Sequence, residues 1–179
     1  MYIKDYQEFC RRAQNGDILI VVDPAMARKF FDEINTSTLL KEIGEPLSKE
    51  RFLVKMCGLI GLILLIGEII ISILALKWYS IIAIPFIVKA FTYIVEKSSL
   101  GRQNFISLFF IVAIFAWLAY YLKGVETFMV IWLILLPLPY FFSSLMYQLA
   151  TIFLRSLVIR NEKAFYLLYK YNNIIYNNE

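Results

Sequence analysis

The chain has 179 residues, of which 60% are hydrophobic and only 18% are charged. A soluble domain is about half apolar and about a quarter charged, so this composition predicts an integral membrane protein. The sequence has no His, the usual general base and commonest metal ligand, and its 2 Cys residues are too few for a disulfide framework. Metalloprotease, nucleophile-elbow and phosphate-loop motifs are also missing from it. We therefore expect neither an enzyme nor a site for a cofactor or metal.

Residues 1–53 predict a cytoplasmic segment made mainly of helices. A short helix is expected over 4–13 and is closed near Gly16. Another should begin at the Asp-Pro pair at 23–24, where an N-cap residue precedes a proline at the first helical position. Ser48 is expected to cap a helix that continues directly into the membrane.

Two parts of the cytoplasmic region are less regular in sequence. The stretch DILIVV (17–22) fits a strand or a helix equally well, and a strand there would need a partner from elsewhere in the chain or from another chain. Residues 147–179 predict a cytoplasmic or interfacial segment with an amphipathic helix over 160–176. Its Asn-rich end, YNNIIYNNE, is expected to fray.

Residues 54–146 predict a transmembrane domain, because a bilayer core about 30 Å thick needs about 20 helical residues to cross it. The four apolar runs expected to cross are 54–76, 78–95, 105–122 and 125–146. Lys77 and Lys123 leave room only for tight turns, so the runs should pair as two helical hairpins. Pro137 and Pro139 are expected to kink the fourth crossing, which a further helix along the inner surface would follow.

The distribution of basic residues predicts the orientation of this domain. Of the 18 Lys and Arg residues, fifteen lie on one expected side, namely in the N-terminal segment together with Lys55 at the start of the first run, in the gap between the second and third runs, and in the C-terminal segment. The two tight turns contain only Lys77 and Lys123. Because positive residues favour the cytoplasmic side, both termini should be cytoplasmic, in a plasma or inner membrane. Trp78 and Trp117 then lie at the outer interface, where aromatic residues are enriched.

Glu68 and Lys89 are charged residues inside runs that are otherwise apolar. In the hairpin formed by 54–76 and 78–95, they lie about 12 Å and about 16 Å below the outer turn. Their side chains lean toward each other, since helical side chains point toward their own N-terminus. A charge inside the membrane is costly and is usually paired or beside a wet cavity. A structural salt bridge, a charged pore or transport path, and contact with lipid are the three interpretations.

Small residues follow one stripe of the first run, and this stripe also includes Glu68. Cys57, Gly61, Ser72 and Ala75 share it at 3.6 residues per turn. Small residues let helices approach closely, so the stripe predicts a packing face toward protein, inside the hairpin or against a second copy.

The sequence therefore predicts an all-α integral membrane protein with four transmembrane helices and a small helical cytoplasmic cap from both termini. We expect a self-associating subunit that forms a pore or disturbs the membrane, with a cap that receives a partner or signal. A non-conducting accessory or scaffold subunit of a larger membrane complex is the first alternative, and a small transporter is the second. The expected partners are the lipid bilayer and other copies or subunits. Nucleic acid is not expected, because no base-stacking platform accompanies the basic residues.

Overall fold

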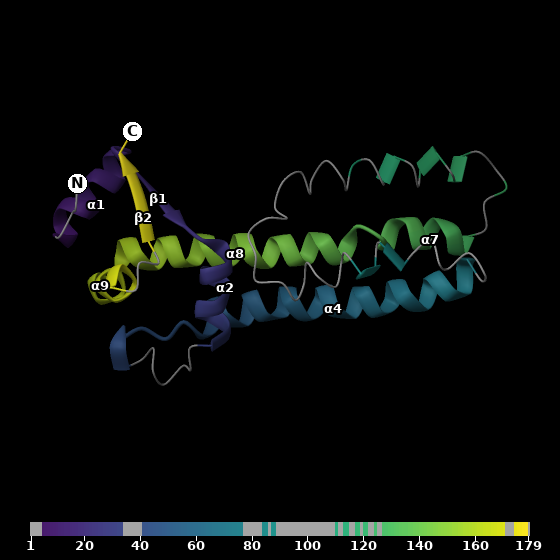
Figure 1. The fold of residues 1–179 in the computed structure, drawn as a ribbon, viewed down its shortest axis with the longest axis horizontal. Helices are drawn as coiled ribbons and strands as arrows, with labels where there is room; N and C mark the ends of the chain where they lie inside the picture. Colours follow the sequence, from purple (N-terminus) through teal and green to yellow (C-terminus); the bar gives the residue numbers. More distant parts are fainter. Residues whose placement is uncertain are drawn as a thin grey trace. The chain divides into compact units, whose positions relative to one another are not determined.

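The computed structural model describes residues 5–33, 41–76, 124, 127–170 and 174–178, with isolated positions between 84 and 121. The described chain is mostly helical, and two of its helices, α4 (Ser48–Leu76) and α8 (Leu138–Arg160), are long and apolar enough to cross a membrane. Figure 1 shows the elements in their sequence colours. The second and third expected crossings lie almost entirely outside the described residues. The chain divides into two compact units, Met1–Val54 with Tyr147–Glu179, and Lys55–Met146.

The first helix, α1 (Tyr6–Asn15), is defined by signals at both of its ends. The Asp5 side chain accepts a hydrogen bond from the backbone N–H of Gln7, as an N-cap residue does. Gly16 ends the helix with φ 80°, and its N–H points back to the carbonyls of the last turn. A left-handed backbone conformation at this position is readily available to glycine, so the sequence prediction of the helix end is confirmed.

A two-stranded sheet resolves the ambiguity of residues 17–22. The strand β1 (Ile18–Val22) pairs antiparallel with β2 (Ile174–Asn178), with Ile20 opposite Tyr176. The predicted helix over 160–176 and the frayed end are therefore wrong in part, because α9 (Glu162–Lys170) ends before the strand. Asn is a weak helix former and Ile-Ile favours a strand, and pairing gives the backbone of β1 the partner that it requires.

The helix α2 (Pro24–Glu33) begins at the predicted Asp-Pro pair. The Asp23 carboxylate accepts a hydrogen bond of 2.6 Å from the N–H of Ala25. Phe31 is buried and meets the ring of Phe153 on α8 edge-on at 6.3 Å between centroids. Arg28 donates a hydrogen bond of 2.8 Å to the hydroxyl of Tyr147 and lies over its ring, so polar and apolar contacts both hold α2 on α8.

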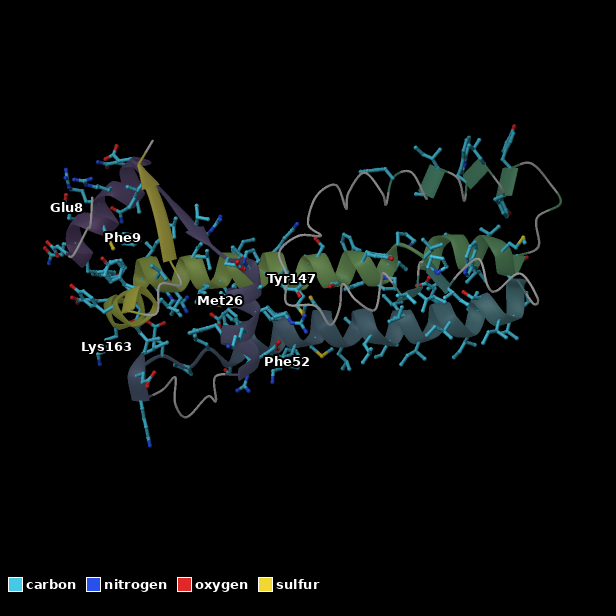
Figure 2. The ribbon with its side chains drawn as sticks, viewed as in Figure 1. Glu8, Phe9, Met26, Phe52, Tyr147 and Lys163 are labelled. Carbon is cyan, nitrogen blue, oxygen red and sulfur yellow. The ribbon has the colours of Figure 1, made fainter. Side chains whose placement is uncertain are left out.

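The helix α1 packs where α8 ends and α9 begins. The ring of Phe9, labelled in Figure 2, lies 4.6 Å from that of Phe165 on α9, and neither side chain is exposed. The Tyr6 hydroxyl donates a hydrogen bond of 2.6 Å to the carbonyl of Ile159 in the last turn of α8. Burial is the main cause that raises the pKa of Tyr6 to about 12, and the neighbouring Cys10 contributes to the rise.

Asn161, between α8 and α9, connects three parts of this unit. Its side-chain oxygen accepts a hydrogen bond from the N–H of Ala164 and thereby caps α9. Its side-chain nitrogen donates to the Ile43 carbonyl and to the Glu45 carboxylate, each at 3.1 Å. One side chain thus both starts a helix and holds the segment that precedes α4.

We expect Asn161→Ala to lower the free energy of unfolding by about 1–2 kcal/mol, because the cap and two further hydrogen bonds are lost together. Asn161→Ser is the matched control, because a serine hydroxyl can still cap α9 but is too short to reach Ile43. Its loss should be smaller by about 1 kcal/mol. Thermal or denaturant unfolding of the full chain in detergent measures both, and equal losses would contradict the capping role.

In the second unit, α4 runs beside α7 (Thr127–Leu135) and the first part of α8 (Figure 1). The chain breaks between α7 and α8 at Leu136 and Pro137, as the prolines predicted. The helix α8 continues without interruption to Arg160, so it crosses the boundary expected at residue 146, where the two compact units divide. The physical reason is that Pro139 lies in the first turn of α8, where a missing N–H costs nothing, while no helix breaker follows it.

Candidate functional site

The most unusual buried group in the second unit is the carboxylate of Glu68. Its side chain is 0% exposed, although it lies in the apolar helix α4. Neither carboxylate oxygen has a hydrogen-bond partner in the structure described. Burying a polar group without a partner is costly, and burying a charge without one costs much more. A group that persists under such a cost is a candidate functional site.

The helices α4 and α8 pack closely on the N-terminal side of Glu68. A Cβ atom at Gly58 would lie 3.0 Å from the sulfur of Met146, and one at Gly61 would lie 3.5 Å from the Cβ of Phe142. Gly61 also faces the Pro139 carbonyl at 3.6 Å. The backbones of α4 and α8 therefore approach each other directly here, which small residues permit.

A second set of contacts lies one turn beyond Glu68 on α4. The indole N–H of Trp132 on α7 donates a hydrogen bond of 2.7 Å to the Ser72 hydroxyl. The Ser72 hydroxyl in turn donates at 2.6 Å to the backbone carbonyl of Glu68. The Trp132 N–H and the Ser72 O–H therefore donate to other acceptors. For this reason neither polar neighbour donates to the Glu68 carboxylate.

These contacts place Glu68 opposite the break between α7 and α8. Gly61 of α4 lies opposite Phe142, and Ser72, further along α4, lies opposite Trp132. The α7–α8 segment therefore runs antiparallel to α4. Glu68 lies between Gly61 and Ser72 on α4. The break at Leu136 and Pro137 lies between Trp132 and Phe142 on the opposing segment. The unpartnered carboxylate and the interrupted backbone therefore occupy the same level of the unit.

The break leaves backbone acceptors without their usual helical donors. Pro137 and Pro139 have no N–H, so they give no hydrogen bond to the carbonyls of Leu133 and Leu135 one turn earlier. Broken helices in membrane proteins use such carbonyls at ion sites. A carboxylate on one helix and carbonyls without helical donors on the other thus lie at the same level, and both are groups that accept a positively charged species.

The structure brings together most of the site residues that the sequence predicted. Cys57, Gly61, Glu68 and Ser72 are all buried on one side of α4. Gly61 faces α8, and Ser72 accepts a hydrogen bond from Trp132 on α7. Residues 78–95 lie almost entirely outside the described residues, so packing of the stripe inside the first hairpin or on a second copy stays a prediction. The first turns of α8 lie antiparallel to α4 and extend along this face.

Three predicted features have different outcomes. Lys89 and the side chain of Ala75 lie outside the described residues, so the pairing of Lys89 with Glu68 stays a prediction. Pro137 and Pro139 mark the observed break. Sequence reasoning missed Trp132, and its one signal was an indole N–H in the middle of an apolar run, where it requires an acceptor.

The opposite side of α4 presents large apolar side chains at its surface. Exposed residues there include Leu59, Leu62, Ile63, Ile66, Ile70 and Ile73. A helix that is apolar on its exposed side suits a lipid environment, because a monomeric soluble protein rarely exposes so long an apolar face.

Comparison of the sequence with protein-family models, with curated proteins and with solved structures finds no match. The chemistry of the site itself is therefore the basis for its function.

Proposed function

We propose that this protein is a multi-pass membrane protein that moves a small cation across the membrane through the interior that contains Glu68. The observation that supports this proposal best is the fully buried carboxylate without a partner, which faces an interrupted helix at the same level. An ionisable residue inside a membrane most often belongs to an ion path or a proton relay. The apolar surface of α4 supports placement of this interior within lipid.

The full burial of Glu68 favours an occluded site over a pore that is open at this level. A permanently open, water-filled pore would expose the carboxylate to solvent, whereas its side chain is 0% exposed. The small transporter expected as an alternative from the sequence thus becomes the best supported form. Self-association remains a proposal, because few helices enclose a route alone.

Ion flux into liposomes that contain the purified protein tests this function. Wild-type protein should conduct protons or monovalent cations under a membrane potential. Glu68→Gln should reduce the flux by at least about tenfold. The reason is that the energy barrier for a positively charged species rises when the negative charge of Glu68 is removed. Glu42→Gln is the matched control, since Glu42 is exposed and the substitution removes the same charge. Equal flux in both variants, or no flux in wild type, would overturn the proposal.

The proposed topology has four crossings with both termini in the cytoplasm of a cell bounded by a plasma or inner membrane. Reporter fusions at Lys77 and Lys123 should report an external location, and fusions at Gly101 and Glu179 a cytoplasmic one. The reason is the concentration of Lys and Arg on one side. A cytoplasmic reporter at Lys123 would contradict the four-crossing arrangement and make the segment around Pro137 re-entrant.

A non-conducting accessory subunit is the second candidate, and the size of the cytoplasmic unit favours it. This unit includes Met1–Val54 and Tyr147–Glu179, which is close to half of the chain. Such a unit offers a surface for a partner or a signal. The two candidates differ in one measurement, because an accessory subunit alone would give no flux in liposomes but would co-purify with a conducting complex.

A further inference from the structure

We propose that the cation bound at this site is a proton, taken up and released by the Glu68 carboxylate at the break between α7 and α8. This inference rests on the proposed transport function and names its substrate. The reaction is a simple protonation, in which a carboxylate and a proton from water give a neutral carboxylic acid. No oxidant, metal or co-reactant is needed.

The hydrogen-bond donors around the Glu68 carboxylate favour its protonated form. An ionised carboxylate is an acceptor only, and here no described donor reaches it. Two donors of this unit, the Trp132 indole and the Ser72 hydroxyl, are used in a chain of hydrogen bonds that ends on the Glu68 backbone carbonyl. A protonated carboxyl has no net charge, so it fits these surroundings at a much lower desolvation cost.

The hydrogen-bond acceptors at the break also favour a protonated Glu68. A protonated carboxyl gains one O–H donor, which needs an acceptor in a dry interior. The carbonyls of Leu133 and Leu135 receive no helical hydrogen bond from Pro137 and Pro139, and the break lies at the level of Glu68. The backbone therefore offers the neutral acid what it lacks, while the same carbonyl dipoles would repel an anion.

The charged groups of the neighbouring helices likewise favour a neutral Glu68. Residues 127–146, from α7 and the first part of α8, contain no Asp, Glu, Lys or Arg, and their one titratable side chain is the buried Tyr140. On α4 the other titratable groups of this unit are Cys57 and Lys55, nearer the start of the helix. No described basic side chain of α4, α7 or α8 thus neutralises Glu68 at its own level, and Lys89 is outside the described residues.

The space around Glu68 favours a proton over a metal cation such as Na⁺. A metal ion needs about six oxygen ligands at fixed distances and a space of its own. A proton adds almost no volume to a carboxylate. Glu68 has no exposed surface, and Leu65 beside it and Leu136 at the break are 2% and 7% exposed. The tight packing at this level favours the ion that needs no cavity.

Infrared difference spectroscopy during a pH change tests this proposal directly in detergent or nanodiscs. Wild-type protein and the Glu42→Gln control should show a carboxylic-acid carbonyl band that disappears as pH rises, and Glu68→Gln should lack that band. A thermal unfolding transition in Glu68→Gln would show that the variant is folded. Wild-type protein without the band at any accessible pH would overturn the proposal.

Two further arms distinguish the competing explanations. If the band appears only in Lys89→Met, then Glu68 is ionised in a salt bridge and the proton site is wrong. If Na⁺ at fixed pH removes the band or drives the flux, the ion is Na⁺ and the proposal is equally wrong. A pH-dependent band from Glu68 in a protein that gives no flux would support proton binding and overturn the transport function alone, so the two failures are distinguishable.

Discussion

The substitution Gly61→Leu is expected to lower the free energy of unfolding of the single chain by about 1–3 kcal/mol, the usual cost of overpacking. The first side-chain atom at position 61 would already lie 3.5 Å from the Cβ of Phe142 and 3.6 Å from the Pro139 carbonyl. Further leucine atoms must then displace the backbone of α8 or its side chains. Thermal unfolding in mild detergent should therefore show a lower transition temperature at unchanged monomer mass.

The chain contains a matched control for this experiment. Gly67 lies on the same helix, and a Cβ atom there meets no atom of the described part of the chain within 4 Å. Gly67→Leu should leave stability unchanged or slightly higher, because leucine favours a helix over glycine by up to about 1 kcal/mol. Gly61→Ala should also be tolerated, since its single added carbon makes ordinary contacts. If Gly61→Leu instead leaves the chain as stable as wild type but separates an oligomer, then the face of Gly61 packs on a second copy.

Glu68→Met is expected to have the opposite effect and to raise the free energy of unfolding by about 1–3 kcal/mol, the cost of a buried polar group without a hydrogen bond. Methionine is flexible and close in length to glutamate, so it can fill the same space between α4 and the break. Chemical or thermal unfolding in detergent at neutral pH measures the change. Flux through the same variant should be lost.

Greater stability together with lost flux would mark Glu68 as a residue that is retained for function at the expense of stability. Glu68→Gln is the control, because its amide occupies the same volume and is uncharged but remains polar, so its gain should be smaller. A clear loss of stability in Glu68→Met would contradict the arrangement, since it would mean that the carboxylate has a favourable partner. Lys89 is the partner that the sequence predicts, and Lys89→Met should then destabilise the chain in the same way.

Local signals in the sequence were sufficient for the ends of several elements. Gly16 closes α1, the Asp-Pro pair begins α2, and Pro137 lies at the break before α8. Each of these depends on the backbone geometry of one or two residues, so no knowledge of the rest of the fold is needed. The burial of Gly61 and Glu68 on one face of α4 also follows from helical periodicity, because the spacing alone decides which side chains share a face.

The sequence by itself thus determined that the chain is largely helical, that α4 is apolar, and which face of α4 is buried. Only the tertiary structure decided what covers that face, namely the break and the first turns of α8. It also decided that β1 pairs with β2, more than 150 residues later in the chain. The physical reason is that periodicity and caps act over a few residues, whereas the choice of a packing partner depends on shape and hydrogen bonds between distant segments. A small-residue stripe fits any closely packed helix, and a lone strand accepts any compatible edge, so neither pattern names its partner.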